Sequence, residues 1–360
     1  MQKRLLFFCS FILFLLIITV VGLGIAFYRY PISAQKEPFF FTISTDESIK
    51  EIAEALVVKG VSPQIYPMLF AAKWLGKLGQ IKAGEYAIPA HATFRQFLKM
   101  LASGQVLLHK ITFPEGRTFA QMLTIIAAEP NLMHTFKDRN PEEIMAMIGH
   151  PGEYPEGLFY PDTYLFSVGT KDTQILRLAY HLMQKKLNQA WMCRTLNVPY
   201  QNANEALIVA SLVERESKVD AERPMIAGVI LKRLKIGMRL QIDAAVLYGL
   251  QDKTQTALKR MDLLIDTPYN TYTRYGLPPT PIAMPGMRAI NAALHPASSD
   301  ALYYVAKGDG SHIFSDTLAQ HHLAVSAYRK ARMMNRSIDL RQCISIPLFL
   351  HFWTAIPLVF

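Results

Sequence analysis

The sequence predicts an α+β protein with an N-terminal transmembrane helix, a small α+β module and a larger, mainly helical α+β domain. Three observations lead to this prediction. A charge-free apolar run occupies residues 5–28, strand-like and helix-like patterns alternate from about residue 38, and helical periodicity dominates after about residue 155. At 360 residues, the chain is long enough for two modest domains with a real hydrophobic core.

The first predicted element is the segment LLFFCSFILFLLIITVVGLGIAFY at 5–28, which is long enough to cross a bilayer. It follows Lys3 and Arg4, so residues 1–4 are expected in the cytoplasm and the rest of the chain outside it. A cleavable signal peptide is the alternative, because ISA before Gln35 suits a cleavage site. The apolar core of a signal peptide seldom exceeds about 15 residues, however. We therefore expect a retained single-pass anchor in the inner, cytoplasmic membrane.

The chain is basic, with 38 Lys and Arg against 28 Asp and Glu and a formal net charge of +10. Such a charge suits a polyanionic partner. Scattered basic residues on an exported chain argue against nucleic acid and favour an anionic wall polymer or a membrane surface. A merely solvated basic surface explains the charge equally well. The three cysteines, Cys9, Cys193 and Cys343, indicate neither a disulfide framework nor a metal site.

Residues 38–105 are predicted to form the small module. A strand is expected at 39–43, and a capping box of Ser48 and Glu51 begins a helix that ends at Gly60. A second helix over 63–75 leads to a strand in GEYAIP. This order of strand, helix, helix and strand is the layout of a small carbohydrate-binding LysM-like module, although many α+β modules share it.

Residues 106–154 are predicted to connect the two folded parts. A helix in TFRQFLKMLASG ends at Gly104, and a strand, a turn and a helix follow in 106–129. From Pro130 to Pro155 the sequence becomes polar and contains several prolines and glycines. This change of composition predicts the domain boundary.

The larger domain is predicted over 155–335. Helices are expected over 173–187, 205–216, 221–234 (with Gly237 as a stop signal) and 318–333, and a strand in ALYYVAKG. The proline-rich segment 266–286 is expected to be a loop whose polar and aromatic side chains suit a sugar site. The apolar tail, 336–360, is either a second membrane span, a segment buried against the domain or an atypical chain end.

Two glutamates end the apolar helix in EALIVASLVERES. On a helix, Glu214 and Glu216 point about 200° apart, so they cannot both face one cleft. Glu216 continues the more apolar stripe, which is formed by Val209, Leu212 and Val213. An apolar setting and the negative end of a helix both raise the pKa of a carboxyl group, which favours a proton donor near neutral pH.

Two considerations oppose a catalytic interpretation of this helix end. Arg215 and Lys218 would lower the pKa of Glu216. Both glutamates could also be surface residues that form salt bridges, as most Glu-x-Glu pairs are.

Seven stretches of the chain together indicate a family. They are KAGEYAI, EGLFYPDTY, SLVERES, ERPMIAGVILKRLKIGMRLQ, YNTY, GLPPTPIAMPG and HIFSDTLAQH. The chain closely resembles the endolytic murein transglycosylase family, MltG or YceG-like, from about residue 40 to 330. The catalytic glutamate of lytic transglycosylases is typically followed by Ser or Thr, and the matching dipeptide here is Glu216-Ser217.

The resemblance implies a carbon-oxygen lyase that cuts the bond between N-acetylmuramic acid and N-acetylglucosamine within glycan strands and leaves 1,6-anhydro ends. It would trim or terminate nascent strands, with peptidoglycan as substrate, peptidoglycan synthases as possible partners, and no cofactor or metal. Glu216 would act first as acid and then as base, because the 6-hydroxyl of the sugar can replace water as the attacking group. A carboxylate of Asp162 or Asp243 opposite Glu216 would argue against this mechanism with a single acid.

The same resemblance predicts substrate contacts. The candidates are Ser217, Gln241, Tyr248, Tyr269, Asn270 and Tyr272. Asn270 could bond an N-acetyl group, and the tyrosines could pack against sugar faces or simply in the core. Ser217 could orient the acid or only cap the helix. His312 and His321 match family positions without a third metal ligand, so a structural role is expected.

Three positions depart from the family pattern. Ile242 and Ala244 replace Thr and Pro, and Met284 replaces Asn, and these changes bear on the shape of the substrate groove more than on the acid itself. Two other functions remain open from the sequence. One is a non-catalytic scaffold that binds the cell wall, and the other is a muramidase that hydrolyses the same bond.

Overall fold

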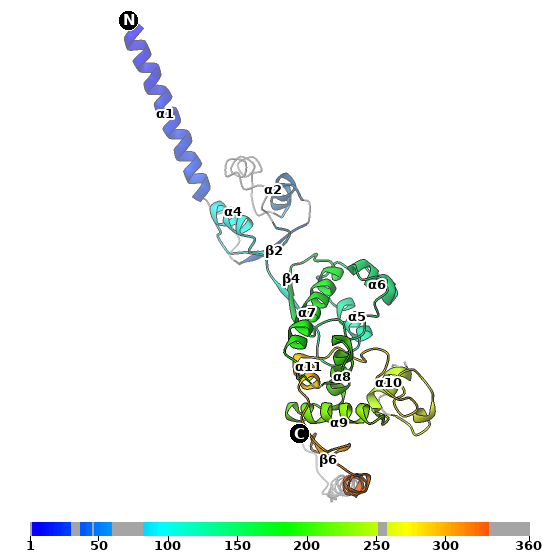
Figure 1. Ribbon diagram of the computed structural model, residues 1–360. Helices are drawn as coiled ribbons and strands as arrows, with labels where there is room; N and C mark the ends of the chain where they lie inside the picture. The colour runs from blue at the N-terminus through cyan, green and yellow to red at the C-terminus, as the bar shows by residue number, and fades with distance from the viewer. Residues whose placement is uncertain are drawn as a thin grey trace, which may run out of the picture. The chain divides into compact units, whose positions relative to one another are not determined.

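The computed structural model describes residues 2–29, 37–44, 47–59, 82–196, 198–250 and 258–330. Their contacts define two compact units. The first comprises Met1–Pro114, Ala120–Tyr154 and Asp162–Tyr180, and the second comprises Glu115–Phe119, Pro155–Pro161 and His181–Phe360. Helices alternate with three separate two-stranded antiparallel sheets in the described residues (Figure 1). The α+β class predicted from the sequence is confirmed.

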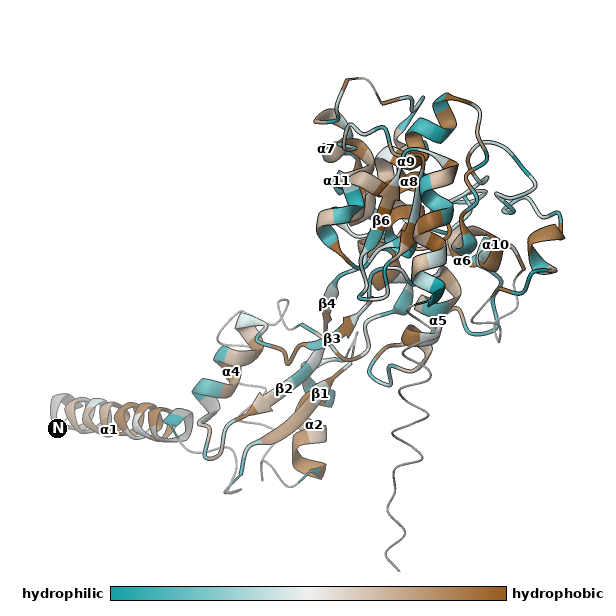
Figure 2. Ribbon diagram, turned by 90° about the horizontal axis from the view of Figure 1, so that it is seen from below, coloured by the Kyte–Doolittle hydropathy of each residue, from teal (hydrophilic) through white to brown (hydrophobic). Residues whose placement is uncertain are grey.

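The first helix, α1, spans Gln2–Arg29 and so includes the predicted 5–28 segment. Its described side chains are almost all apolar and exposed, and Figure 2 shows them in brown along the helix. Its side chains are described at 7–8, 10–25 and 29. Among the described residues, no helix qualifies by length and apolar character as a membrane-crossing segment. The transmembrane anchor expected over residues 5–28 stays a prediction.

The small module follows the sequence prediction where it is described. β1 (Phe39–Ile43) pairs antiparallel with β2 (Gly84–Ile88), as expected. The capping box of Ser48 and Glu51 begins α2 (Ile49–Val58), which ends two residues before Gly60. The helix predicted at 63–75 lies outside the described residues. α4 (Phe94–Ser103) ends at Gly104, whose left-handed φ of 63° closes the helix.

The module has its own hydrophobic core. Aromatic and aliphatic side chains from both strands and both helices meet there and are almost completely buried. They are Phe41, Ile43, Ile52, Ala53, Leu56, Tyr86, Ile88, Ala92, Phe97, Leu98 and Leu101. Alternate residues of each strand face this core, as the period of two requires.

The connecting segment contains one helix that the sequence analysis missed. β3 (His109–Thr112) and α5 (Phe119–Ala127) lie where a strand and a helix were expected. α6 (Pro141–Ile148) forms in the stretch read as a boundary, because a capping box of Asn140 and Glu143 starts it and Gly149 ends it. β4 (Thr163–Phe166) pairs with β3, so residues 162–180 join the first unit rather than the predicted 155–335 domain. α7 (Asp172–Met192) is longer than the predicted 173–187.

The second unit is built around α8 (Ala203–Glu216), the apolar helix predicted at 205–216. Eight consecutive residues, Ala206 to Val213, are buried. α8 packs against α9 (Arg223–Lys235), α10 (Asp243–Leu250) and α11 (Met287–Leu294) (Figure 1). α9 follows a short 3₁₀ turn over Asp220–Glu222, so the helix predicted at 221–234 is divided. The sequence analysis missed α10 and α11, which have only eight residues each.

The remaining elements carry the loop and the last sheet. Residues 266–286 form neither helix nor strand, as expected for a proline-rich loop, and follow the 3₁₀ turn Asp262–Leu264. β5 (Tyr303–Ala306) is the predicted strand, but its partner β6 (His312–Ser315) was not predicted. A helix runs from 318 to 330, and the apolar tail lies outside the described residues.

Candidate active site

Glu216 is the last residue of α8, and its carboxylate is held by a tyrosine from β5. The Tyr304 hydroxyl donates to Glu216 Oε2 over 2.9 Å. Burial is the main cause that raises the pKa of Glu216, and the charge of Asp243 raises it further. The hydrogen bond from Tyr304 and the charges of His312 and Arg215 lower it, but the net shift is upward. This direction is the one expected from the apolar stripe of the helix.

Glu214 has a different environment, as the angular separation on the helix predicted. Its carboxylate forms an ion pair with Arg223 over 2.9 Å, and the two side chains are only 5% and 7% exposed. The backbone N–H of Gly286 also donates to Glu214 Oε2 over 2.9 Å. A side chain at position 286 would overlap the carboxylate of Glu115, so that carboxylate would have to move. Glu214 therefore joins α8 to the start of α11.

A second carboxylate lies within electrostatic range of Glu216. Asp243 is the first residue of α10, is exposed, and accepts a hydrogen bond of 2.6 Å from the Tyr272 hydroxyl. Burial raises the pKa of Tyr272, and the bond to Asp243 and the charges of Asp243 and Glu216 raise it further. The charges of both carboxylates therefore act on the pKa of Tyr272 in the same direction. Asp162, the other carboxylate considered from the sequence, belongs to the first unit, where it accepts from the N–H of Thr163 at the start of β4.

The loop that carries Tyr272 is fastened to the segment before α10. The N–H of Gln241 donates to the Thr271 carbonyl over 3.1 Å. The Thr271 hydroxyl accepts from the N–H of Ile242 over 2.8 Å. Gln241 has an exposed side chain and a left-handed φ of 53°. These bonds fix the positions of Gln241, Asp243 and Tyr272 relative to one another.

Arg233 of α9 organises the other side of this site. Its guanidinium is buried and donates to the carbonyls of Leu240 and Leu302, each over 2.7 Å. Leu240 precedes Gln241, and Leu302 precedes the strand that carries Tyr304. Arg233 was not predicted as a site residue, because an arginine in KRLK is typical of a solvated helix end.

Asn270 corrects a prediction. The side chain is fully buried, and its amide group donates to the carbonyls of Leu263 and Ile265 over 3.1 and 2.6 Å. Its oxygen accepts from the backbone N–H groups of Tyr272 and Thr273. These four bonds use the whole hydrogen-bonding capacity of an amide. Asn270 therefore shapes the loop that presents Tyr272, instead of offering its amide to an N-acetyl group.

Tyr248 and Tyr269 form a packed pair rather than an open sugar platform. Their rings meet edge to face at 4.8 Å and pack against the core of the second unit. The Tyr248 hydroxyl donates to Glu156 Oε2 over 3.1 Å, and the Tyr269 hydroxyl bonds to Thr280 over 2.8 Å. Both polar ends are therefore engaged within the protein. Core packing, the second reading of these tyrosines, is the one that the structure favours.

Ser217 closes the end of α8. Its side chain is buried, and its hydroxyl accepts from the N–H of Val219 over 3.0 Å and donates to the carbonyl of Val219 over 3.2 Å. Its own N–H donates to the carbonyl of Val213. These contacts belong to a local turn that caps the end of α8.

Glu156 is a buried carboxyl group that the sequence analysis did not single out. It accepts from the N–H of Phe119 at the start of α5 and from the Tyr248 hydroxyl. Burial raises its pKa to about 7, although the hydrogen bonds from Phe119 and Tyr248 oppose the shift. Its place in EGLFYPDTY carried no signal beyond the family resemblance, because burial of a glutamate cannot be read from local pattern.

The raised pKa of Glu156 predicts a pH-dependent stability. Between about pH 4.5 and 7, the folded protein keeps a proton on Glu156 that the unfolded chain has released. The free energy of unfolding should therefore fall by up to roughly 3 kcal/mol as pH rises through this window, and then level off. Glu156→Gln should remove this dependence in urea unfolding measured from pH 4.5 to 8. Glu142→Gln, at an exposed glutamate, is the control, and equal pH slopes in both variants would contradict the prediction.

The two histidines have structural contacts. His312 bonds to Glu222 through its ring, with Nδ1 and Oε2 2.8 Å apart, and through its backbone N–H over 2.9 Å. The ring of His321 stacks on Tyr303 at 5.2 Å. These contacts tie β6 to the turn before α9, and the helix at 318–330 to β5.

The three residues that depart from the family pattern are buried or half-buried. Ile242 and Met284 are buried, with exposed fractions of 1% and 0%, and Ala244 is half-buried against the same core. A larger apolar residue at a buried position alters packing under the site rather than its lining.

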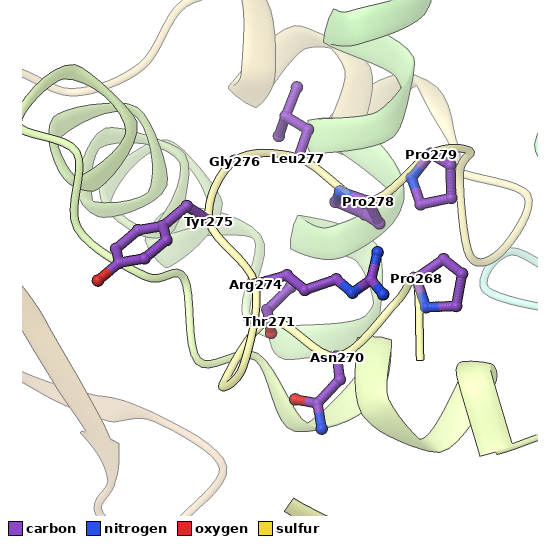
Figure 3. A pocket seen from close by; sticks show the side chains of 9 residues that line it. All are labelled: Pro268, Asn270, Thr271, Arg274, Tyr275, Gly276, Leu277, Pro278 and Pro279. Atoms are coloured by element: carbon purple, nitrogen blue, oxygen red, sulfur yellow. The ribbon is translucent and has the colours of Figure 1, made fainter. Parts of the chain in front are cut away.

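A pocket of about 250 Å³ lies along the proline-rich loop (Figure 3). Its lining comprises Pro268, Asn270, Thr271, Arg274, Tyr275, Gly276, Leu277, Pro278 and Pro279. Figure 3 shows Arg274 reaching among the prolines while Tyr275 points the other way. Arg274 forms an ion pair with Asp266 over 2.9 Å, and Arg239 stacks on the Tyr275 ring at 4.8 Å.

Comparison with known proteins places this chain in a family. The model of the YceG-like family matches residues 41–327. An endolytic murein transglycosylase of Bacillus subtilis is 37% identical over 174 residues, which are 48% of this chain and 48% of that protein. Another, from Streptococcus pneumoniae, is 31% identical over 183 residues, which are 49% of this chain and 33% of that protein. The chain thus spans half or less of the length of these curated relatives.

A solved structure agrees with the sequence matches. The crystal structure of a YceG-like protein from Listeria monocytogenes is 29% identical, with a TM-score of 0.51, and the match covers 80% of this chain and 99% of that chain. The likeness therefore extends over both sequence and fold. Because the family model covers most of its length, the chain belongs to the YceG-like family.

Proposed function

We propose that the protein is an endolytic lytic transglycosylase, a lyase that cuts peptidoglycan between N-acetylmuramic acid and N-acetylglucosamine and leaves 1,6-anhydro ends. The observation that carries the proposal is Glu216, a half-buried carboxyl group with a raised pKa at the end of α8. The names of the relatives, endolytic murein transglycosylases, support the same activity. We assign Glu216 the role of the catalytic acid because the pair Glu216-Ser217 resembles the Glu-Ser or Glu-Thr pair of lytic transglycosylases.

The proposed reaction needs one group that gives and then takes a proton. Glu216 protonates the glycosidic oxygen, and the bond between C1 and that oxygen breaks with its electron pair going to the leaving sugar. The 6-hydroxyl of the muramic acid ring then attacks C1, and Glu216 accepts the hydroxyl proton. No water is consumed, and the carboxyl group ends protonated as it began. A raised pKa favours the protonated starting form of Glu216.

Product analysis tests this proposal against its two alternatives. Purified sacculi incubated with the protein should release fragments whose muramic acid ends have the mass of the anhydro form. A muramidase would instead give ends heavier by one water, and a wall-binding scaffold would sediment with sacculi and release nothing. Either of those results would overturn the proposed activity.

The predicted substrate residues divide into two groups under this proposal. Gln241, with its exposed side chain, and Tyr272, beside both carboxylates, remain candidates for contact with the glycan. The other four candidates have polar groups that are engaged within the protein, so we assign them structural roles. They are Ser217, Tyr248, Tyr269 and Asn270. A further part of the glycan strand is proposed to lie in the pocket along the proline-rich loop.

We further propose that α1 anchors the protein in the cytoplasmic membrane and that both units act outside it. The support is the charge-free stretch 5–28 within a helix of 28 residues, preceded by Lys3 and Arg4. The 38–105 module would bind glycan in the manner of a LysM-like domain, close to peptidoglycan synthases. Alkaline phosphatase fused after residue 110 should be active in cells. An inactive fusion, with a cytoplasmic reporter active at the same position, would contradict this topology.

A further inference from the structure

The two oxygens of the Glu216 carboxyl group have different surroundings. Oε2 accepts from the Tyr304 hydroxyl over 2.9 Å. Oε1 has no hydrogen-bond partner in the part of the chain that the structure describes, and the residue is half-buried rather than enclosed. A carboxyl group that transfers a proton to a substrate must bring one oxygen within hydrogen-bond reach of it. Oε1 is the oxygen available for that contact.

The Tyr304 hydroxyl is the donor in its bond to Glu216. Burial raises the pKa of Tyr304 well above its ordinary value, and the charge of Glu216 raises it further, so the phenol keeps its proton. Among the described residues, this hydroxyl donates to Glu216 and has no second partner. If Oε2 carried the acid proton, the Tyr304 proton would lose its acceptor. The acid proton of Glu216 is therefore assigned to Oε1.

Tyr304 is itself held on two sides. The carbonyl of Leu302, two residues earlier, accepts from the buried Arg233 guanidinium over 2.7 Å, which fixes the start of β5. The ring of Tyr304 meets the His312 ring edge to face, with the ring centres 5.6 Å apart. His312 is in turn tied to Glu222 through its ring and its backbone N–H. Tyr304 therefore presents its hydroxyl from a fixed position.

We propose that Tyr304 is the positioning residue of the active site: its hydroxyl occupies Oε2 of Glu216 and leaves Oε1 to donate the proton and to accept it back. This inference rests on the proposed transglycosylase activity. The proton passes from Oε1 to the glycosidic oxygen, and the bond between that oxygen and C1 breaks with its electron pair going to the leaving sugar. The 6-hydroxyl attacks C1, and its proton returns to Oε1. Tyr304 acts through Glu216 and exchanges no proton.

The hydrogen bond from Tyr304 becomes stronger during the first half of this reaction. Glu216 becomes a carboxylate when it donates its proton, and a hydrogen bond to an ionised acceptor is roughly twice as strong as one between neutral groups. A donor that is already in place needs no reorganisation at that moment. Tyr304 therefore stabilises the charge that appears on the acid, which lowers the barrier to cleavage of the glycosidic bond.

Other charged and titratable groups act electrostatically on Glu216 from several elements of the second unit. They are Arg215 on its own helix, Asp243 on α10, Arg233 on α9, His312 on β6 and Tyr272 on the proline-rich loop. Removal of the Tyr304 hydroxyl leaves all of these groups in the protein. A change in the pH profile of such a variant therefore reports the lost hydrogen bond.

The test compares pH profiles of anhydro-product release by the full chain. Tyr304→Phe should lower turnover by roughly 10- to 100-fold with KM near that of the wild type, because it removes a hydrogen bond to a charged group and keeps the ring. It should also move the alkaline limb of the profile to higher pH. The reason is that the bond from Tyr304 lowers the pKa of Glu216, and the reaction begins from the protonated acid. A merely structural role would leave the limb where it is.

Tyr303→Phe is the matched control on the same strand. It removes the hydroxyl of the neighbouring residue, whose ring stacks on His321 at 5.2 Å. Its turnover and its alkaline limb should stay near those of the wild type. A Tyr304→Phe variant that keeps the wild-type limb, as Tyr303→Phe does, would overturn the inference.

A second substitution keeps the test decisive if Tyr304→Phe fails to fold. Replacement of Tyr304 alone by meta-fluorotyrosine keeps the ring and the hydroxyl, and the fluorine makes that hydroxyl a stronger donor. The alkaline limb should then move to lower pH, opposite to the shift in Tyr304→Phe, and an unshifted limb would overturn the inference. Failure of the wild type to release anhydro products would instead overturn the proposed function, so the two failures are distinct.

Discussion

Glu216→Gln should reduce the release of anhydro-muropeptides on the order of 10⁴-fold and leave the fold intact. The amide can neither donate a proton to the glycosidic oxygen nor accept one from the 6-hydroxyl, so both halves of the reaction lose their catalyst. The shape of the side chain is kept, and its oxygen can still accept from Tyr304. Turnover on purified sacculi, followed by mass spectrometry, measures the effect.

A matched variant on the same helix controls for loss of charge. Glu205→Gln makes the same substitution in the first turn of α8, where the carboxylate accepts from the N–H of Gln201. It should retain activity. If Glu216→Gln retained activity comparable to Glu205→Gln, Glu216 would not be the acid.

Arg223→Ala should lower the free energy of unfolding by about 3–5 kcal/mol, the largest loss of stability expected from one substitution at this site. The guanidinium and the carboxylate of Glu214 are both nearly buried and form two hydrogen bonds, of 2.9 and 3.0 Å. Removing the guanidinium leaves the buried carboxylate of Glu214 with the N–H of Gly286 but without an opposite charge. Urea unfolding at pH 7 measures the loss.

The neighbouring ion pair of Arg288 and Asp220 provides the comparison. The Arg288 side chain is 70% exposed, so solvent already screens the pair. Arg288→Ala should therefore cost about 0–1 kcal/mol. Equal losses in the two variants would show that burial of the Glu214 pair contributes nothing to stability.

The elements that were predicted correctly from sequence pattern are those determined by residues close to one another in the chain. The apolar periodicity of α8 and the capping box of α2 both act within a few residues, and the structure contains both. α10 and α11 escaped prediction because eight residues hold too few turns for a periodic signal. β6 was not predicted, because HIFS becomes a strand only through its pairing with β5.

The candidate site shows the same division. The sequence could place Glu216 on the more apolar stripe of α8, since that follows from helix geometry alone. It could not supply Tyr304, whose hydroxyl reaches Glu216 from 88 residues further along the chain. Asn270 was assigned the wrong partners for a related reason. Its amide bonds to a loop whose conformation depends on the tertiary structure, and residue type gives no sign of that burial.

Gln241 shows where the chain gives up stability. Its backbone has a φ of 53°, a conformation that costs a residue with a side chain roughly 1 kcal/mol and that glycine adopts freely. The strain remains because the bonds to Thr271 hold the segment on one side and Arg233 holds Leu240 on the other. A glycine here would relax the backbone and remove an exposed amide two positions from Asp243. Glutamine at position 241 therefore keeps an exposed amide on a strained backbone, and the bonds on either side hold that strain in place.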